Sequence, residues 1–519
     1  MTRADDIADP SHVHGVTLVL VVLVLALANF LAIMDITIVN VLVPQIAGSL
    51  AVSSADGTWV ITSYAVAEAI MVPLTGWLAE RFGPVKVFVA GIAGFGIVSV
   101  LCGLATTLPM LIAFRIMLGI CGGPLIPLSQ TLLLTVVPKK YEMPALAVWS
   151  MTTILGPVAG PVLGGIIADQ WSWPWAFHFK MPLALGLAAL AWYVLKKHEM
   201  PTTKARVDFV GLGLLILWVG ALQIMLGNGQ NMDWFNNDFI VALLIVTILG
   251  FISFVIWEMT DRKPIVDLRI FSNRAFSVSM VVIFLAYGAL FGAVVLVPLW
   301  LQNIMGYTAT WAGYNTAFAG LISLPVAPLT TKLMSKYDHR GIVMVGLLFC
   351  AASSLMRIFY SLDVTFGQTL WPQVLQGISF PLILIPLMDM SVSSLPAKDT
   401  ASGAGQFNFI RTLSGAIATA IVVAVWEDAI KWSKATLAGS VQHGPDMLLA
   451  LQQMGGFSEA KARSLFDLAV LQQAAQLGTN QSFLAIGVVL LVTAGLVWIA
   501  PKPPRHANGN GNGKPPIGH

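Results

Sequence analysis

The stretch "NFLAIMDITIVNVLVPQ", residues 29–45, consists mainly of apolar side chains and contains one carboxylate, that of Asp35. It belongs to an apolar run over about residues 16–43, and about 20 such residues let a helix cross the hydrocarbon core of a bilayer. No lysine or arginine lies near Asp35 in the sequence. Because an ionisable group inside a membrane span costs about 3 kcal/mol, we predict that this run is a membrane helix and that Asp35 is functional.

The composition of the whole chain indicates a membrane protein. Of the 519 residues, 57% are hydrophobic and only 10% are charged, whereas soluble domains carry about 25% charged residues. The net charge of +3 does not indicate a nucleic-acid partner, because the basic residues lie in short loops between apolar runs. The three cysteines all fall inside apolar runs, which argues against a disulfide framework. The first apolar run is longer than the core of a signal peptide, so we expect it to be retained.

Fourteen runs are long and apolar enough to be membrane helices. They cover approximately residues 16–43, 58–79, 85–107, 108–137, 142–168, 174–195, 207–226, 238–258, 276–302, 308–331, 341–360, 367–395, 399–426 and 480–500. The predicted fold class is therefore an all-α integral membrane protein.

The lysines and arginines predict the orientation of these spans. With the N-terminus inside, 20 of the 28 basic residues fall in inner loops, and the short outer loops contain none. Because lysine and arginine accumulate in cytoplasmic loops, we expect both termini to be cytoplasmic. The four basic residues that fall within spans are Arg115, Lys180, Arg357 and Arg411.

Two internal echoes predict a duplicated architecture. "GWLAERFGPVK" (76–86) resembles "TTKLMSKYDHR" (330–340), and "LGICGGPLIPL" (118–128) resembles "QGISFPLILIPL" (376–387). Each echo joins a span to the one eight positions later, as expected for two six-helix halves separated by two extra helices, and facing repeats are common in secondary transporters. The expected parts are a cytoplasmic tail 1–15, a six-helix bundle 16–195, a cytoplasmic loop 196–206, two extra helices 207–258, a cytoplasmic loop 259–275, a second six-helix bundle 276–500 and a disordered cytoplasmic tail 501–519.

One outer loop, 427–479, is much longer than an ordinary connection. Its sequence predicts two short amphipathic helices broken at Gly455 and Gly456. The loop is either a cap packed on its own chain or a docking surface for another protein, and the sequence leaves both alternatives open.

Few charged side chains lie deep in the spans. Asp35 and Arg115 are expected in the outer halves of spans one and four, Glu68 within span two and Arg411 midway along span thirteen. Burial favours the neutral form of a carboxylate and a neighbouring arginine favours its charged form, so Asp35 or Glu68 is expected to exchange a proton. The alternatives are that Asp35 only bonds a neighbouring helix and that Arg115 is only a counter-ion. Lys180, at the outer end of span six, is expected to reach the membrane surface with its long side chain.

The fifth span contains "LGPVAGPVLGG" (155–165). Gly156, Gly160 and Gly164 recur at every fourth position and predict a smooth helix face, which permits a close approach to another helix. Pro157 and Pro161 remove backbone donors and bend the helix.

Several of these segments resemble the major facilitator superfamily, and specifically its fourteen-span, EmrB-type branch of drug:proton antiporters. "MDITIVNVLVP" (34–44) is similar to the first-span motif of that branch, and "GPVAGPVLGG" to its span-five motif. "GWLAERFGPVK" resembles the inner-loop motif through Gly76, Arg81 and Gly83, with Glu80 in place of the usual aspartate. "RIMLGICGGP" resembles the fourth-span motif through Arg115 and Gly119. In "WSWPWAFHFKMP", Lys180 stands where asparagine is usual.

The resemblance implies a proton-driven exporter of hydrophobic drugs in the bacterial inner membrane. It further implies a periplasmic membrane-fusion adaptor and an outer-membrane channel as partners, besides membrane lipids, and no cofactor. Asp35, Glu68 and Arg115 are the expected proton-coupling residues. The candidates for the substrate cavity are Asn40, Gln130, Tyr287, Asn408 and Arg411.

Three alternatives remain beside this interpretation. The first is a dedicated exporter of one metabolite class, such as fatty or aromatic acids, and the second is a receptor that binds ligand without moving it. The third, an enzyme, is disfavoured because the eight histidines are scattered and form neither an H-E-x-x-H motif nor a Cys/His cluster. We therefore expect no catalytic residue and no metal site.

Overall fold

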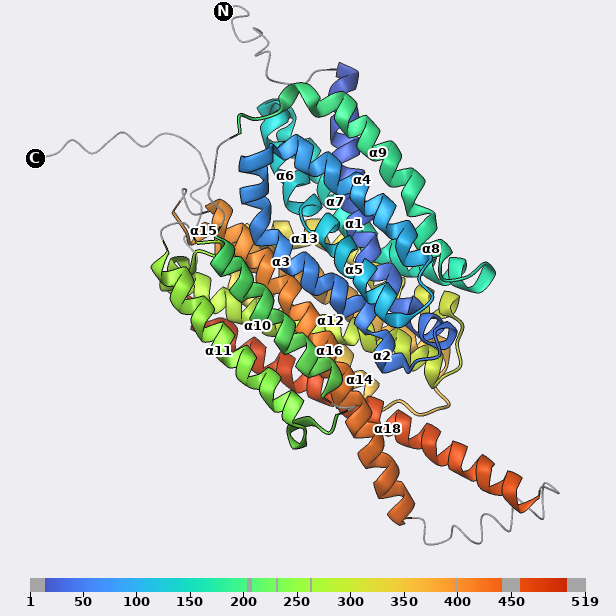
Figure 1. The fold of residues 1–519 in the computed structure, drawn as a ribbon. Helices are drawn as coiled ribbons and strands as arrows, with labels where there is room; N and C mark the ends of the chain where they lie inside the picture. The colour runs from blue at the N-terminus through green and yellow to red at the C-terminus, as the bar shows by residue number, and fades with distance from the viewer. Residues whose placement is uncertain are drawn as a thin grey trace, which may run out of the picture.

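The structure is a computed structural model that describes residues 15–202, 208–229, 232–261, 264–396, 400–440 and 458–501. The described residues outside the loops are all helical, and most of the helices run side by side in one bundle (Figure 1). The predicted all-α class is confirmed. The two predicted terminal tails lie outside the described residues, except for residues 15 and 501. The first of the two amphipathic helices expected in the long outer loop also lies outside them.

The first half consists of nine helical segments. They are α1 (Gly15–Ser49), α2 (Ser54–Gly57), α3 (Trp59–Phe82), α4 (Pro84–Gly103), α5 (Leu108–Gly122), α6 (Leu125–Val136), α7 (Lys139–Gln170), α8 (Trp175–His178) and α9 (Lys180–Leu195). We call the end of the bundle at which α1 begins the inner end, following the orientation predicted from the basic residues.

Two further helices, α10 (Phe209–Asn228) and α11 (Asp238–Thr260), precede the second half. The second half contains α12 (Arg274–Asn303), α13 (Ala309–Met334), α14 (His339–Arg357), α15 (Phe366–Ser393), α16 (Thr400–Ser440) and α18 (Glu459–Leu496).

Thirteen helical stretches within the described residues are long and apolar enough to cross a membrane. The predicted fifth span corresponds to α7, a helix of 32 residues that comes in addition to these thirteen. It packs between α1 and α13. With α7 included, the helices correspond to the fourteen predicted spans.

The fourth predicted span, 108–137, is broken into α5 and α6. The break falls at "GGP": α5 ends at Gly122, and Pro124 is the N-cap of α6. Proline has no backbone N–H to continue the helical hydrogen bonds. The sixth predicted span is similarly divided into the short α8 and the longer α9.

The two halves meet mainly along two pairs of helices, α7 with α13 and α3 with α16, and α1 also contacts α12. At the outer end, Gln302 Nε2 donates to the Val41 carbonyl oxygen at 2.9 Å. There too, the Thr310 backbone N–H donates to Asp169 Oδ2 at 2.8 Å. The extra helix α10 contacts both α3 and α16 and so lies across the boundary between the halves.

The predicted outer loop 427–479 is largely helical where the structure describes it. α16 continues to Ser440 instead of ending near residue 426, and α18 begins at Glu459 instead of near 480. Both helices extend beyond the bundle at its outer end (Figure 1). The second predicted amphipathic helix is therefore wrong as a separate element, because it is continuous with the last span. Close packing of Gly478 on Ala429 and Ile430 and the Trp426–Thr479 hydrogen bond, at 2.8 Å, hold the two helices together.

Candidate functional site

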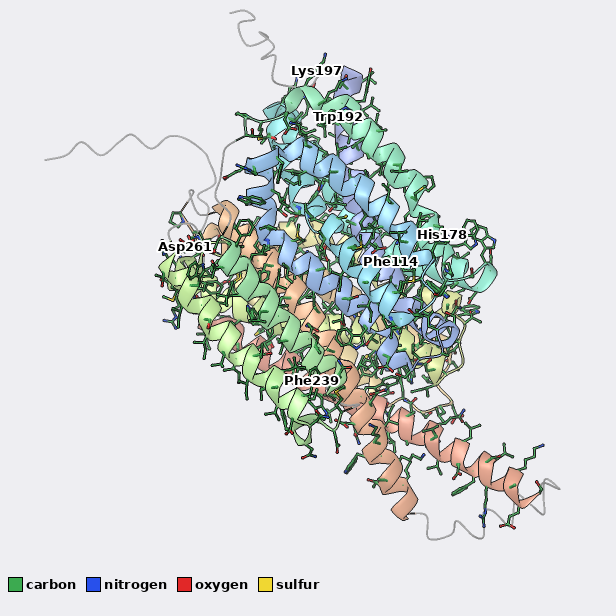
Figure 2. The ribbon with its side chains drawn as sticks, viewed as in Figure 1. Phe114, His178, Trp192, Lys197, Phe239 and Asp261 are labelled. Carbon is green, nitrogen blue, oxygen red and sulfur yellow. The ribbon has the colours of Figure 1, made fainter. Side chains whose placement is uncertain are left out.

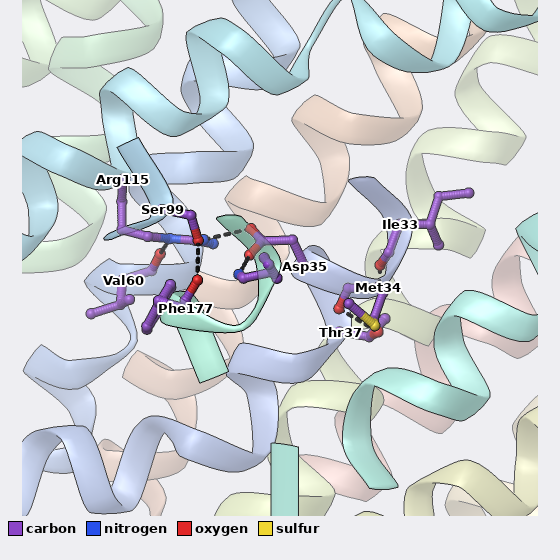
Figure 3. Close-up of polar contacts among 9 residues, drawn as sticks. Ile33, Met34, Asp35, Thr37, Val60, Ser99, Arg115 and Phe177 are labelled. Atoms are coloured by element: carbon purple, nitrogen blue, oxygen red, sulfur yellow. Dashed lines mark hydrogen bonds and ion pairs between the residues drawn. The ribbon is translucent and has the colours of Figure 1, made fainter. Parts of the chain in front are cut away.

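Asp35 and Arg115 form an ion pair in the interior of the first half. Arg115 Nη1 donates to Asp35 Oδ2 at 2.6 Å, and the side chains are 1% and 0% exposed. Arg115 Nε also donates to the carbonyl oxygen of Val60, at 2.8 Å (Figure 3). Helices α1, α3 and α5 thus hold the pair in place. Arg115 is a counter-ion of Asp35, as the sequence analysis considered.

Lys180 is the second cation at this site, and the expectation that it reaches the membrane surface is wrong. Its side chain is fully buried and its Nζ is ion-paired with Asp35 Oδ1. Lys180 begins α9, which packs against α1 and α4. Its position at the start of a helix does not place it at the membrane surface, because α8 precedes it and α1 continues past Asp35 to Ser49. His178, at the end of α8, and Lys197, just after α9, are labelled in Figure 2 near the two ends of α9.

Aromatic rings surround the three charged groups. The Arg115 guanidinium lies 4.3 Å from the centre of the Tyr64 ring, and Lys180 Nζ lies 4.5 Å from that of Phe177. The Phe177 carbonyl oxygen accepts a hydrogen bond from Ser99 Oγ at 2.9 Å, which attaches α8 to α4 (Figure 3). These rings favour the cations electrostatically and fill the space that water would occupy. We call Asp35, Arg115 and Lys180 the buried charge cluster.

Polar side chains from both halves lie near one another around Glu68. Glu68 on α3 is 3% exposed, and Arg411 on α16 is the charged neighbour that acts on it most strongly. The Arg411 guanidinium lies 5.7 Å from the centre of the Tyr287 ring on α12, and Tyr287 stacks on Phe291. The structure therefore brings two of the predicted substrate-cavity residues, Arg411 and Tyr287, within electrostatic reach of Glu68, without an ion pair between Glu68 and Arg411.

The other substrate-cavity candidates have different surroundings. Asn40 is 1% exposed, and neither atom of its side-chain amide has a hydrogen-bond partner among the described residues. Asn408 is half-buried and donates to the Ala404 carbonyl oxygen at 3.1 Å. Gln130 is half-buried on α6. A buried amide without a partner is rare in proteins, which makes Asn40 the strongest of these three candidates for contact with cargo.

The predicted smooth face of α7 packs on α1. A Cβ atom at Gly156 would lie 2.6 Å from Ile33 Cγ2, one at Gly164 would lie 2.7 Å from Ile38 Cγ1, and one at Gly160 would overlap Thr37 Oγ1. The close approach predicted for these glycines is confirmed. Pro157 and Pro161 lie within the same helix.

A second close contact of α7, which the sequence did not predict, faces the other half. Gly313 of α13 lies against the backbone of Pro161, Gly320 against Val158, and Gly165 against Ala309. Helix α7 therefore contacts its own half on one side and the opposite half on the other.

The inner-loop motif, 76–86, covers the end of α3, Gly83 and the start of α4, and several of its residues lie at the surface. Gly76, Glu80 and Arg81 are exposed, and neither Glu80 nor Arg81 is ion-paired with another described residue. Gly83 has φ +94°, a backbone conformation that favours glycine.

Glu199, which the sequence did not single out, caps α4 beside Gly83. Its carboxylate accepts the backbone N–H groups of Val85 and Lys86, both at 3.1 Å. Gly119, in the fourth-span motif, allows α5 to approach α3, because a Cβ there would lie 2.6 Å from the Tyr64 carbonyl oxygen.

Comparison with known sequences places the chain in a family. The family model described as Major Facilitator Superfamily matches residues 25–419. The chain is 40% identical over 504 residues to the Multidrug export protein EmrB of Escherichia coli (strain K12), which covers 96% of this chain and 98% of that protein. It is 38% identical to the Fatty acid resistance protein FarB of Neisseria gonorrhoeae, over 97% of this chain and 100% of that protein.

Solved structures share the fold. A bacterial homolog of the human lysosomal transporter Spinster, in an inward-facing and unoccupied conformation, matches with a TM-score of 0.65 at 16% identity, over 94% of this chain and 98% of that one. A D-xylose-proton symporter matches with a TM-score of 0.63 at 14% identity, over 94% and 99% of the two chains. Together with the helical architecture, these matches show that the chain is a multi-pass membrane protein that belongs to the major facilitator superfamily and, within it, to the EmrB-type transporters.

Proposed function

We propose that the protein is a proton-coupled multidrug efflux transporter, a drug:H⁺ antiporter that exports hydrophobic toxic compounds across the inner membrane. The observation that carries the proposal is the buried charge cluster: three ionisable groups, each at most 1% exposed, in the membrane interior of one half. Such groups are expensive and mark ion or proton pathways. The 40% identity to a multidrug export protein supports drugs as the cargo.

The cluster couples proton and drug through its effect on the arrangement of the halves. Loss or gain of one proton changes the net charge between α1, α5 and α9, and so changes how tightly these helices are held. A ligand shifts a conformational equilibrium only by its differential affinity for the two states. In this proposal the state open to the inside binds the drug more tightly, and the state open to the outside binds the proton more tightly. The drug is therefore released to the outside as the proton binds, and the proton is released to the inside as the drug binds.

The outer arm, α16 beyond Trp426 and α18 before Thr479, serves in this proposal as the docking surface for a periplasmic adaptor, which would continue to an outer-membrane channel. Exposed apolar side chains on it support a protein partner: Trp432, Leu468 and Leu471 are 62%, 51% and 42% exposed. The orientation predicted from the basic residues supports this proposal, in which the arm lies in the periplasm and both termini lie in the cytoplasm.

A second candidate function is the export of one metabolite class, such as fatty acids. The 38% identity to a fatty acid resistance protein favours it. Susceptibility profiling of a deletion strain distinguishes the two. Broad sensitisation to unrelated compounds supports the multidrug exporter, and sensitisation to fatty acids alone supports the dedicated one.

Purified protein in proteoliposomes with an imposed pH gradient tests the transport itself. We expect uptake of a fluorescent lipophilic cation such as ethidium, against its concentration gradient, when the lumen is acidic. An ionophore that dissipates the gradient should abolish the uptake. Ligand binding without gradient-dependent flux would contradict the proposal and favour a receptor.

A further inference from the structure

The buried charge cluster contains one more cation than anion. Asp35 supplies one negative charge, while Arg115 and Lys180 supply two positive charges when both are ionised, and all three side chains are at most 1% exposed. A drug exporter that used only an aspartate–arginine pair would have no need for the second cation. The presence of Lys180 in the cluster therefore needs an explanation.

The neighbouring groups do not supply the missing negative charge. Cys102 on α4 and Tyr64 on α3 are the other titratable groups within electrostatic reach of the cluster in the first half, apart from Glu68, and a thiol and a phenol are neutral at physiological pH. Glu68 lies within electrostatic reach of Arg115 and Asp35 as well as of Arg411 of the other half, but its carboxylate forms no ion pair with a described residue and so does not contact the cluster. Lys180 itself otherwise contacts the rings of Phe177 and Phe95.

The three groups differ in what a proton would do to the cluster. Protonation of Asp35 would leave two buried cations without a counter-ion, and uncompensated buried charge is strongly disfavoured. Arginine does not lose its proton in proteins. Deprotonation of Lys180 leaves one carboxylate paired with one guanidinium, which is a neutral cluster. Lysine is also the cation that readily changes its protonation when it is buried.

We infer, on the basis of the proposed function, that the coupling proton is carried on Nζ of Lys180 and not on the carboxyl group of Asp35. In the state open to the inside, an N–H bond of the ammonium breaks, the electron pair stays on Nζ, and the proton passes to water. In the state open to the outside, the amine takes a proton from water and becomes an ammonium ion again. Asp35 stays a carboxylate throughout and holds Arg115 in both states.

The place of Lys180 in the fold agrees with this role. It begins α9 directly after the short α8, so a separation of α8 and α9 from α1 would open a path from Lys180 toward the outer end of the first half. Both the ammonium and the amine can donate a hydrogen bond to Asp35, so the contact between α9 and α1 survives the change of protonation while its strength changes.

Substrate-induced proton release from purified protein tests the assignment. Ethidium is added to weakly buffered protein, and the released protons are counted with a pH indicator between pH 6 and 9. Lys180→Arg preserves the positive charge but cannot lose a proton, so we expect it to bind ethidium with release falling from about one proton to none. Lys180→Gln cannot carry a proton either, so we expect release to fall to none in this variant as well. Lys197→Arg makes the same change at an exposed position and should behave like the wild type.

The outcomes separate this inference from the proposed function. Gradient-driven ethidium flux in the wild type, together with proton release that persists in Lys180→Arg or in Lys180→Gln, would overturn the role of Lys180 and leave the exporter intact. Absence of flux in the wild type would contradict the exporter itself. Thermal unfolding and ethidium binding check that each variant is folded, and Lys180→Gln serves if the larger arginine does not fit.

Discussion

At the scale of single residues, the protein buries charged and polar side chains in its interior. Asp35 is paired with two cations, Glu68 lies within electrostatic reach of Arg411 of the other half, and the amide of Asn40 has no hydrogen-bond partner among the described residues. Each of these groups costs stability, since buried polar groups without full compensation are unfavourable. A chain that retains them has a use for them, and each leads to a measurable expectation.

Asp35→Asn should destabilise the protein as well as stop export. It removes the carboxylate that pairs with two buried cations, and breaking a buried ion pair from one side costs about 3–5 kcal/mol. The double variant Asp35→Asn/Lys180→Gln removes one of the two cations and should recover part of the lost thermal stability, but not transport. Equal melting temperatures for the single and double variants would show that Lys180 does not feel the charge of Asp35.

Glu68→Gln should weaken the handling of cationic compounds more than that of neutral ones. A cationic drug would compete with Arg411 for the Glu68 carboxylate, and a charged hydrogen bond contributes about 1.5–3 kcal/mol, so we expect resistance to cations to fall roughly tenfold. Growth inhibition by paired cationic and neutral compounds measures this, with Asp363→Asn, an exposed carboxylate in the loop between α14 and α15, as control. Equal losses for both kinds of compound would instead indicate a role in proton transfer.

Asn40→Leu should lower transport without lowering stability. Leucine has the same branched arrangement of side-chain heavy atoms, and the substitution removes a buried amide that lacks a partner among the described residues, a feature that costs about 1–3 kcal/mol. We expect an unchanged or higher melting temperature and a reduced rate of efflux in proteoliposomes. A lower melting temperature would mean that the amide has a structural partner after all.

At the scale of elements, α7 is the helix on which the two halves depend most. Its glycine face fits α1 of its own half, and Gly165, Pro161 and Val158 fit α13 of the other. Because protein interiors are close-packed, this helix transmits a change in one half to the other without a linker between them. The same face that permits close approach therefore also limits which residues the helix accepts.

Gly160→Ala should reduce both stability and transport. The added methyl group would overlap Thr37 Oγ1 and crowd the backbone of α1, and overpacking typically costs about 1–3 kcal/mol. Thermal unfolding and efflux rates are the measurements. Gly186→Ala on α9, where no atom lies within 4 Å of an added Cβ, is the matched control, and it should be neutral or slightly stabilising, since alanine is the better helix former by about 1 kcal/mol.

At the scale of the whole molecule, two bundles are joined at their outer ends, the extra helix α10 spans the boundary between them, and the outer arm extends beyond the bundle. The hydrogen bonds Gln302–Val41 and Asp169–Thr310 must break if the outer ends separate. Transport thus requires the loss of few polar contacts at this end, which suits a reversible rocking motion of two rigid halves.

Shortening the outer arm should separate transport from resistance. Replacing residues 438–462 with a short flexible linker keeps the Trp426–Thr479 contact near the bundle. We expect normal flux in proteoliposomes and lost resistance in cells, because the adaptor could no longer dock. Loss in both assays would mean that the arm is a structural cap, which is the alternative that the sequence left open.

The sequence by itself determined the membrane class, the number of spans and Asp35 and Arg115 as the charged groups to examine. These features are local: the length of an apolar run and the presence of an ionisable group within it can be recognised without knowing what packs beside them. The same local signals led to the wrong expectation for Lys180, because a position near a helix end does not determine depth in the bundle. The unusual lysine at this position was the one available hint.

Only the tertiary structure decided which charges face one another. Lys180 and Asp35 are far apart in the sequence, as are Glu68 and Arg411, and their proximity depends on how α1, α9, α3 and α16 pack. The packing of α18 against α16 likewise made the supposed loop a helical arm. The ionisation of a buried group depends on the charges within a few ångströms, so the chemistry of the site, unlike the class of the protein, is a property of the assembled fold.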